Sequence, residues 1–392
     1  MIISIYIHKM NYKFGGTESY TAKFLEVMQD LYPNAKIALI TECFNKGDEL
    51  SELQLIERMN NGYGTLIKPD NFSVRYIFTK EPYASKNIFE RIKRKYNLIL
   101  FQKKLCTATK NDDLFVNCSN QAVIASAKRN ITIIHFPQDR REYTGIYKRI
   151  PFLRPIARSI DKRYLNCYEC FLPNSNFTAD WLKQKWQLQD KKIHVSYPLV
   201  TPILLQYKKN PMQIAVCGRI EASKKIDVMV KAFNSSEFLK KNCVLKIAGS
   251  CDNEERSYID YIKSLSDGNV QIELNPSRSQ LEELYAESGI FWHAKGYGET
   301  NPMLMEHFGM TTIEAMSAGC IPVVINKGGQ QEIVTADCGF TWDVPEQLVE
   351  YTEKLLGLSD EKIAGMRASC IERSKMCSKE TFKNHVKELL GL

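Results

Sequence analysis

The chain has 392 residues, an apolar fraction of 44% and a charged fraction of 25%, values typical of a folded protein with two domains. It contains no run of about 18 apolar residues, so the sequence predicts no transmembrane helix. The apolar start, residues 1–7, lacks a basic segment and a cleavage site, which favours a first strand over a signal peptide. The net charge of +8 leaves nucleic acid, an anionic membrane and solvent open as neighbours of its basic surfaces.

Short apolar strands alternate with helices through the first half of the chain. Strands are predicted at residues 2–7, 36–41, 73–79, 113–118, 131–134 and 168–172. A helix is predicted at 17–31, where Tyr20, Phe24 and Met28 share one face. Ser175 or Asn176 is expected to cap the helix that contains Trp181.

The same alternation restarts after about residue 200. Strands are predicted at residues 213–217, 244–248, 270–274, 289–292 and 321–324. Helices are predicted at residues 226–235, 254–265, 279–287 and 309–317, with Ser279 and Glu282 as a capping box. Continuous apolar strands between helices indicate parallel sheets covered on both faces. The sequence therefore predicts an α/β chain with two doubly wound, Rossmann-like domains, 1–200 and 201–377, linked by residues 197–202.

The positive charge is concentrated in one segment. Residues 137–165 hold eight basic residues against three acids, and a second basic run lies at 91–95. In the first segment, Arg154 and Arg158 would line one side of a helix and Phe152 and Ile156 another. Such a surface could rest on anionic lipid, or it could be an ordinary helix with a solvated face.

The twelve cysteines do not form a disulfide or metal pattern. They are scattered, and Cys118, Cys217 and Cys243 lie in or beside predicted strands, as small buried hydrophobes do in a reducing compartment. The one close pair, Cys167 and Cys170, has no second pair at metal spacing. We therefore expect no metal, and the chain also lacks an Asp-x-Asp motif.

Polar residues and glycines follow several predicted strands, where ligands bind in open α/β sheets. Gly15 and Gly16 open the helix at 17–31, either as a flexible turn or as a close approach to an anion. Gly218 follows the strand 213–217, and Arg219 and Lys224 could converge on a diphosphate or form a solvated basic turn.

Three further groups stand at such positions. Gly249 follows the strand 244–248, and His135 follows 131–134, although a lone histidine is more often structural. Glu306 and Glu314 have seven residues between them, on either side of the predicted helix start. The helix start would attract a phosphate, and Glu314 could bind a diol or be a surface acid.

In this order, these pieces resemble the retaining GT-B glycosyltransferases of the large family (glycosyltransferase family 4-like, group 1) that includes bacterial mannosyl-, glucosyl- and N-acetylglucosaminyltransferases. The resemblance covers most of the chain and is strongest at residues 213–334. It implies two domains facing across a cleft, with a C-terminal helix, 378–392, packing back on the first domain.

The resemblance also implies roles for individual residues. Arg219 and Lys224 would hold the diphosphate, Glu314 the ribose and Glu306 the transferred sugar, with His135 near the sugar and acceptor. The loop 295–305 departs from the commoner pattern and makes Glu299 a rival for a sugar-facing role. The remaining donor-binding candidates are Gly15, Gly16, Gly218, Gly249, Phe308, Gly309, Met310 and Thr311.

The function implied is transfer of a hexose from GDP-mannose or a UDP-sugar, with retention and without metal or other cofactor. The acceptor would be a saccharide or lipid-linked saccharide in cell-surface polysaccharide synthesis, such as lipopolysaccharide or capsule. The protein would be cytoplasmic, with a peripheral contact to the inner face of the membrane. Three alternatives stay open: a sugar-nucleotide epimerase, a nucleic-acid-binding protein that uses the basic patches, and a catalytically inactive partner subunit.

Overall fold

The computed structural model describes residues 1–12, 15–80, 88–188, 192–205, 207–251 and 255–391, without the side chains of 88–92 and 94–95. Most of the predicted basic run at 91–95 therefore lies outside the described side chains. The chain divides into two compact units. Unit 1 comprises Met1–Leu199 and Lys383–Leu392, and unit 2 comprises Val200–Phe382. No described helix combines the length and the apolar character needed to cross a membrane.

Unit 1 is built on a six-stranded parallel sheet with the strand order β3-β2-β1-β4-β5-β6. Its strands are β1 (Ile2–Ile7), β2 (Lys36–Cys43), β3 (Phe72–Phe78), β4 (Leu114–Asn117), β5 (Arg129–Ile134) and β6 (Cys170–Pro173). Its helices are α1 (Gly16–Leu31), α2 (Glu52–Tyr63), α3 (Ile88–Thr109), α4 (Gly145–Arg149), α5 (Arg154–Cys167) and α6 (Asn176–Trp186). Helix α1 buries Tyr20, Phe24 and Met28, as its periodicity predicts.

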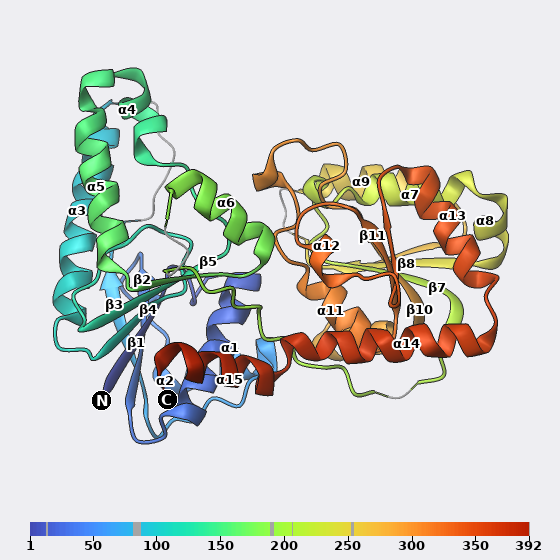
Figure 1. Ribbon diagram of the computed structural model, residues 1–392, viewed down its shortest axis with the longest axis horizontal. Coiled ribbons are helices and arrows are strands. Elements are labelled where there is room, and N and C mark those ends of the chain that lie inside the picture. The colour runs from blue at the N-terminus through green and yellow to red at the C-terminus, as the bar shows by residue number, and fades with distance from the viewer. Residues whose placement is uncertain (13–14, 81–87, 189–191, 206, 252–254, 392) are drawn as a thin grey trace. The chain divides into compact units, whose positions relative to one another are not determined.

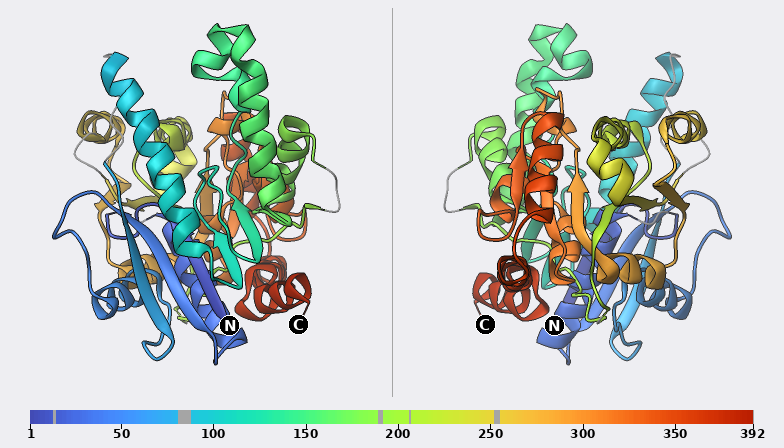
Figure 2. Two further views of the ribbon diagram at one scale, coloured as in Figure 1. Left: turned by 90° about the vertical axis from the view of Figure 1, so that its left-hand side faces the viewer. Right: turned by 90° about the vertical axis from the view of Figure 1, so that its right-hand side faces the viewer.

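Part of the helical layer of unit 1 extends beyond the edge of its sheet. Helices α3 and α5 lie on one side of the strands, and α4 and the start of α5 project beyond them (Figures 1 and 2). Pro155 lies in the first turn of α5, where its missing N–H has no intrahelical partner to lose. Ser175 caps α6, because its side chain accepts a hydrogen bond from the Thr178 N–H.

Unit 2 repeats the design with the strand order β12-β11-β10-β7-β8-β9. Its strands are β7 (Asn210–Cys217), β8 (Val244–Gly249), β9 (Val270–Leu274), β10 (Ser288–His293), β11 (Ile321–Ile325) and β12 (Phe340–Trp342). Strand β12 was not predicted, since three residues are too few to show a pattern. The predicted fold class, two doubly wound parallel sheets, is confirmed.

Helices cover both faces of the second sheet. They are α7 (Ile226–Ser235), α8 (Glu237–Asn242), α9 (Arg256–Leu265), α10 (Arg278–Glu287), α11 (Met310–Ser317), α12 (Gln330–Ile333), α13 (Pro345–Leu356) and α14 (Asp360–Ser374). In Figure 1, α7, α9 and α13 lie on one face and α11 and α14 on the other. The last helix, α15 (Lys379–Leu390), continues into unit 1, where Lys383 lies 3.8 Å from the carboxylate of Asp30.

The predicted capping box at Ser279 and Glu282 is wrong. Helix α10 begins one residue earlier than predicted, and its cap is Ser277, whose hydroxyl accepts from the Gln280 N–H at 3.2 Å. The Gln280 side chain accepts in return from the Ser277 N–H at 2.7 Å. Glu282 instead pairs with Arg278, with 2.8 Å between Nε and Oε1.

This cap gives a stability prediction with a control only two residues away. The Ser277→Ala substitution should cost about 1 kcal/mol, because the first turn of α10 loses its side-chain acceptor. For a unit of this size, that is a fall of about 2–4 °C in the thermal unfolding midpoint. The control is Ser279→Ala, which removes only an exposed contact to the Ser277 hydroxyl at 2.9 Å. Equal midpoints for the two variants, measured by circular dichroism, would contradict this assignment of the cap.

Candidate donor-binding site

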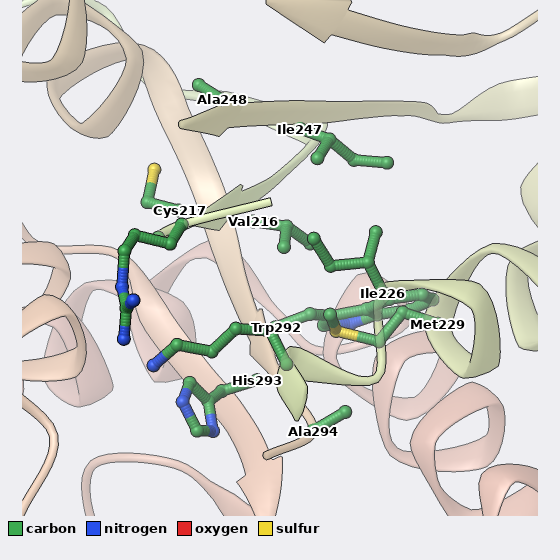
Figure 3. A pocket seen from close by; sticks show the side chains of 12 residues that line it. Val216, Cys217, Ile226, Met229, Ile247, Ala248, Trp292, His293 and Ala294 are labelled. Atoms are coloured by element: carbon green, nitrogen blue, oxygen red, sulfur yellow. The ribbon is translucent and has the colours of Figure 1, made fainter. Parts of the chain in front are cut away.

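The candidate site lies in unit 2, where three strands end. A pocket there is lined by Cys217, Gly218 and Arg219 at the end of β7, and by His293 and Ala294 at the end of β10 (Figure 3). Lys224 enters it from the short turn before α7. Its floor is apolar and is formed by Val216, Ile226, Met229, Ile247, Ala248 and Trp292. The two cations proposed for a diphosphate therefore line one pocket.

Close glycine packing shapes the wall of this pocket. A Cβ atom on Gly249 would lie 1.6 Å from the carbonyl oxygen of Gly218, so no larger residue fits there. Gly218 has a φ of +149°, which residues with a side chain rarely adopt. The two glycines thus bring the ends of β7 and β8 together, and Gly249 acts through packing.

Glu306 is the central acid of the site. Its Oε2 lies 2.9 Å from Lys224 Nζ, and it accepts a hydrogen bond from His293 Nε2 at 3.2 Å. Burial by itself raises the pKa of Glu306, but the positive charges of Lys224 and Lys295 outweigh it and hold that pKa well below its usual range. Glu306 is therefore ionised at neutral pH.

His293 is fixed by this arrangement. A carboxylate only accepts hydrogen bonds, so Nε2 carries the hydrogen and Nδ1 of the neutral ring is an acceptor. Burial lowers the pKa of His293, which keeps the ring neutral. In the part of the chain that the structure describes, the buried Nδ1 has no hydrogen-bond partner. A buried acceptor without a partner is costly, and ligand binding is one way to satisfy it.

Arg219 is more exposed than the other cations. Its side chain is 61% exposed, and its Nη1 lies 3.0 Å from Oε2 of Glu221. A guanidinium held at the mouth of a pocket can turn from a surface carboxylate to a phosphate at little cost. Lys295 is a third cation near Glu306, although burial lowers its pKa. Neither Lys295 nor His293, the last residue of β10, was among the candidates found from the sequence.

The backbone at Glu306 is held in place by two glycines that follow β11. The Gly329 N–H donates to the Glu306 carbonyl at 2.8 Å, and a Cβ on Gly328 would lie 2.1 Å from the same oxygen. Gly309, with a φ of +128°, precedes the first residue of α11. The amides of Met310 and Thr311 begin that helix and have no intrahelical acceptor. Phe308 is 2% exposed and anchors the turn.

Glu314 lies one helical turn inside α11 and is not a surface acid, because its side chain is 13% exposed. Its Oε1 lies 2.7 Å from Nη1 of Arg278, a partner that the sequence analysis missed. Its Oε2 is 3.4 Å from the hydroxyl of Tyr285. Arg278 therefore orients the carboxylate and leaves part of its accepting capacity for a ligand.

The loop 295–305 is tied to its neighbours through Glu299. The carboxylate of Glu299 lies 2.8 Å from Lys225 Nζ, and its carbonyl accepts from Lys327 Nζ at 2.9 Å. This ion pair favours a role for Glu299 in holding the loop over a role in contacting the sugar.

The remaining candidates belong to unit 1. Gly15 precedes the first residue of α1 with an extended backbone, and Gly16 begins the helix. The ring of His135 is bonded through Nε2 to the Cys118 carbonyl at 3.0 Å and packs edge-on against Tyr20. Burial lowers the pKa of His135, so it is neutral. The donor-binding role of Gly15 and Gly16 and the role of His135 near the sugar and acceptor stay predictions.

Metal ligation has no candidate group in the described part of the chain. No three His, Cys, Asp or Glu side chains come together there as a metal site requires. Cys167 and Cys170 are both free thiols. The expectation that the protein uses no cofactor stays a prediction.

Comparison with known families points to the same half of the chain. A family model described as Glycosyl transferases group 1 matches residues 205–376, which are most of unit 2. The chain is 27% identical over 145 residues to GDP-Man:Man(3)GlcNAc(2)-PP-Dol alpha-1,2-mannosyltransferase of Dictyostelium discoideum, and 24% identical over 241 residues to the protein of that name from Mus musculus. These alignments cover 35% and 56% of this chain, but 27% and 47% of those relatives.

Solved structures match the whole chain. Alr3699/HepE of Anabaena, in complex with UDP and glucose, matches over 99% of both chains with a TM-score of 0.66 and 14% identity. WaaG, a glycosyltransferase involved in lipopolysaccharide biosynthesis, matches over 99% of both chains with a TM-score of 0.61 and 14% identity. Residues 205–376 therefore match the Glycosyl transferases group 1 domain, and the solved structures show that the chain has the GT-B fold.

Proposed function

We propose that the protein transfers a hexose from a nucleotide-diphosphate sugar to a saccharide or lipid-linked saccharide acceptor, with retention at the anomeric carbon. The observation that carries this proposal is the pocket of unit 2, where Arg219 and Lys224 line one wall and Lys224 pairs with Glu306. The donor is GDP-mannose or a UDP-sugar, because mannosyltransferases named for GDP-Man and UDP-bound structures are both among the relatives.

The charges that develop during the reaction explain the roles proposed for these residues. Breaking the glycosidic bond leaves positive charge on the anomeric carbon and negative charge on the departing diphosphate. Arg219, Lys224 and the first amides of α11 offer preorganised positive charge to the diphosphate, which is the work a metal ion does in other transferases. Glu306, kept ionised, accepts hydrogen bonds from sugar hydroxyls, and Glu314 does so from the ribose.

The acceptor's proton needs a destination during this step. In the proposed reaction, the acceptor hydroxyl forms the new bond at the anomeric carbon and its proton passes to the departing phosphate oxygen. The reaction therefore balances with the donor and the acceptor alone, and it needs no oxidant. Neutral His293 positions Glu306. Because its ring carries no positive charge, it does not compete with Arg219 and Lys224 for the diphosphate.

We infer in addition that the protein works in the cytoplasm, at an anionic membrane surface. Residues 141–156, which include α4 and the first turn of α5, expose several large apolar side chains. Tyr143, Ile146, Phe152 and Ile156 are 59%, 40%, 78% and 53% exposed. Buried acids neutralise part of the positive charge there, since Glu142 pairs with Arg158 and Asp161 with Arg141. Lys148 and Arg149, on α4, have no described ion-pair partner.

Such a mixture of exposed apolar and basic side chains suits lipid tails and anionic headgroups together. A lipid-linked acceptor for surface polysaccharide would then be met at the membrane. The cytoplasmic location is supported by the twelve free thiols, of which nine are buried.

The donor proposal is tested first by thermal shift. A ligand that binds only the folded state raises the unfolding midpoint. We expect UDP or GDP at millimolar concentration to raise the midpoint by several degrees, and the matching nucleotide-sugar to be consumed only when a saccharide acceptor is present. Epimerised donor without acceptor would favour the epimerase, and no shift with any of UDP, GDP or dTDP would contradict the proposal.

The diphosphate role is tested by Arg219→Ala. Because this side chain is 61% exposed, its loss should leave the unfolding midpoint nearly unchanged. Transfer should fall about 100-fold, as expected when one preorganised charge is removed from the transition state. Lys231→Ala is the control, since Lys231 is a similarly exposed cation, 54%, on the adjacent helix α7. Full activity of Arg219→Ala in a radiolabelled transfer assay would refute the assignment.

The membrane contact is tested by co-sedimentation with liposomes. The wild-type chain should bind vesicles that contain phosphatidylglycerol and should bind pure phosphatidylcholine weakly. Combining Phe152→Ser with Lys148→Glu and Arg149→Glu should reduce binding at least tenfold while transfer to a water-soluble acceptor persists. Exchanging three residues elsewhere on α8, the exposed Phe238→Ser and Lys241→Glu together with the partly buried Lys240→Glu, should leave sedimentation unchanged. Equal sedimentation of both triple variants would remove the support for a membrane role.

A further inference from the structure

The turn that opens α11 lies against a buried side chain to which the donor site gives no role. That side chain belongs to Gln330, the first residue of α12, which is 0% exposed. A Cβ atom on Gly309 would lie 2.7 Å from Nε2 of Gln330 and 3.1 Å from its Oε1. The side-chain amide therefore packs directly on the backbone of Gly309, the residue that precedes the first residue of the helix.

The amide of Gln330 is not satisfied in the part of the chain that the structure describes. Both Nε2 and Oε1 are buried, and neither forms a hydrogen bond with a described residue. Gln213, a buried glutamine on β7, shows the usual arrangement, because its Nε2 donates to Ser288 Oγ at 3.0 Å. A buried polar group without a partner destabilises the folded state, so Gln330 carries a cost that Gln213 avoids.

The start of α11 carries further costs of the same kind. Gly309 has a φ of +128° and a ψ of 56°, a conformation that residues with a side chain rarely adopt. No described side chain caps α11, whereas Ser277 caps α10. The hydroxyl of Thr312, in the first turn of α11, is also buried without a partner among the described residues. Strain and unmet hydrogen bonds that gather at one turn are typical of ligand-binding segments.

The position of this turn in the unliganded protein does not require the amide of Gln330. Gly329 already holds the neighbouring backbone, since its N–H donates to the Glu306 carbonyl at 2.8 Å and a Cβ there would lie 2.5 Å from Phe308 Cα. An apolar side chain of the same shape as Gln330 would fill its space without the cost of an unpartnered amide. The polar group therefore indicates a hydrogen bond that forms in another state of the protein.

We propose that Gln330 is a positioning residue for the donor diphosphate and acts through the Gly309 turn. When a diphosphate binds the first amides of α11, the backbone rotates at Gly309, and a peptide group of the turn forms a hydrogen bond with the Gln330 amide. Because this hydrogen bond forms only with donor bound, it strengthens donor binding. The inference rests on the transferase activity proposed above and deepens it, since it adds a residue that controls donor affinity without touching the donor.

The Gln330→Met substitution tests this role, because methionine is unbranched, apolar and of similar length. Without nucleotide, the thermal midpoint of the variant should lie about 2–4 °C above that of the wild-type chain, since an unsatisfied buried amide is removed. The midpoint shift caused by millimolar UDP or GDP should fall to about half or less. In the transfer assay, the donor KM should rise about tenfold while kcat changes less than about twofold, because the hydrogen bond is present in both the donor-bound ground state and the transition state.

Two matched variants separate this effect from ordinary packing. Gln213→Met removes a satisfied buried amide of the same unit, so it should lower the midpoint and leave the nucleotide shift and the donor KM unchanged. Gln331→Met changes the exposed neighbour of Gln330, whose Nε2 donates to Asn326 Oδ1 at 3.1 Å. It should also leave the nucleotide shift and the donor KM unchanged.

Two results would each overturn the role of Gln330. One is a midpoint of Gln330→Met at or below that of the wild-type chain, which would show that the amide is already satisfied without donor. The other is a nucleotide shift and a donor KM that stay at their wild-type values. A wild-type chain whose midpoint no nucleotide shifts overturns the donor proposal instead, so the two failures are distinct.

Discussion

The carboxylate of Glu306 is the group on which the rest of the candidate donor site depends. Largely withdrawn from water, it stays ionised because Lys224 lies 2.9 Å away and His293 donates to it at 3.2 Å. Removing one partner of such a buried pair typically costs about 3–5 kcal/mol, because the other charge is left uncompensated. The acid and the cations around it therefore form one electrostatic unit, and the ends of β7 and β10 have to stay in register to keep it.

Close backbone contacts at glycines maintain that register. Gly249 meets the carbonyl of Gly218, and Gly328 and Gly329 meet the backbone at Glu306 and His307. A parallel sheet brings the carboxyl ends of its strands to one edge, but only glycines let the following loops approach within hydrogen-bond distance. The glycines at these positions are thus part of the site even where they touch no ligand.

The sequence predicted the fold well and the site only in part. An apolar strand such as 321–324 is buried on both faces, so its composition reveals it, whereas β12 is too short to do so. Arg219, Lys224 and Glu306 were found because they follow strands. Arg278 was missed because its partner Glu314 lies 36 residues away, and no local pattern encodes that contact.

The two contacts of Glu299 that hold the loop 295–305 affect how the free energy of ligand binding is distributed. With Glu299 held by Lys225 on one side and by Lys327 on the other, the loop is ordered before any ligand arrives. Ordering a flexible loop of this length during binding would subtract several kcal/mol from affinity, at about 1 kcal/mol or more for each residue fixed. Here that entropy is lost during folding, so discrimination between donors has to come from the fixed shape of the pocket.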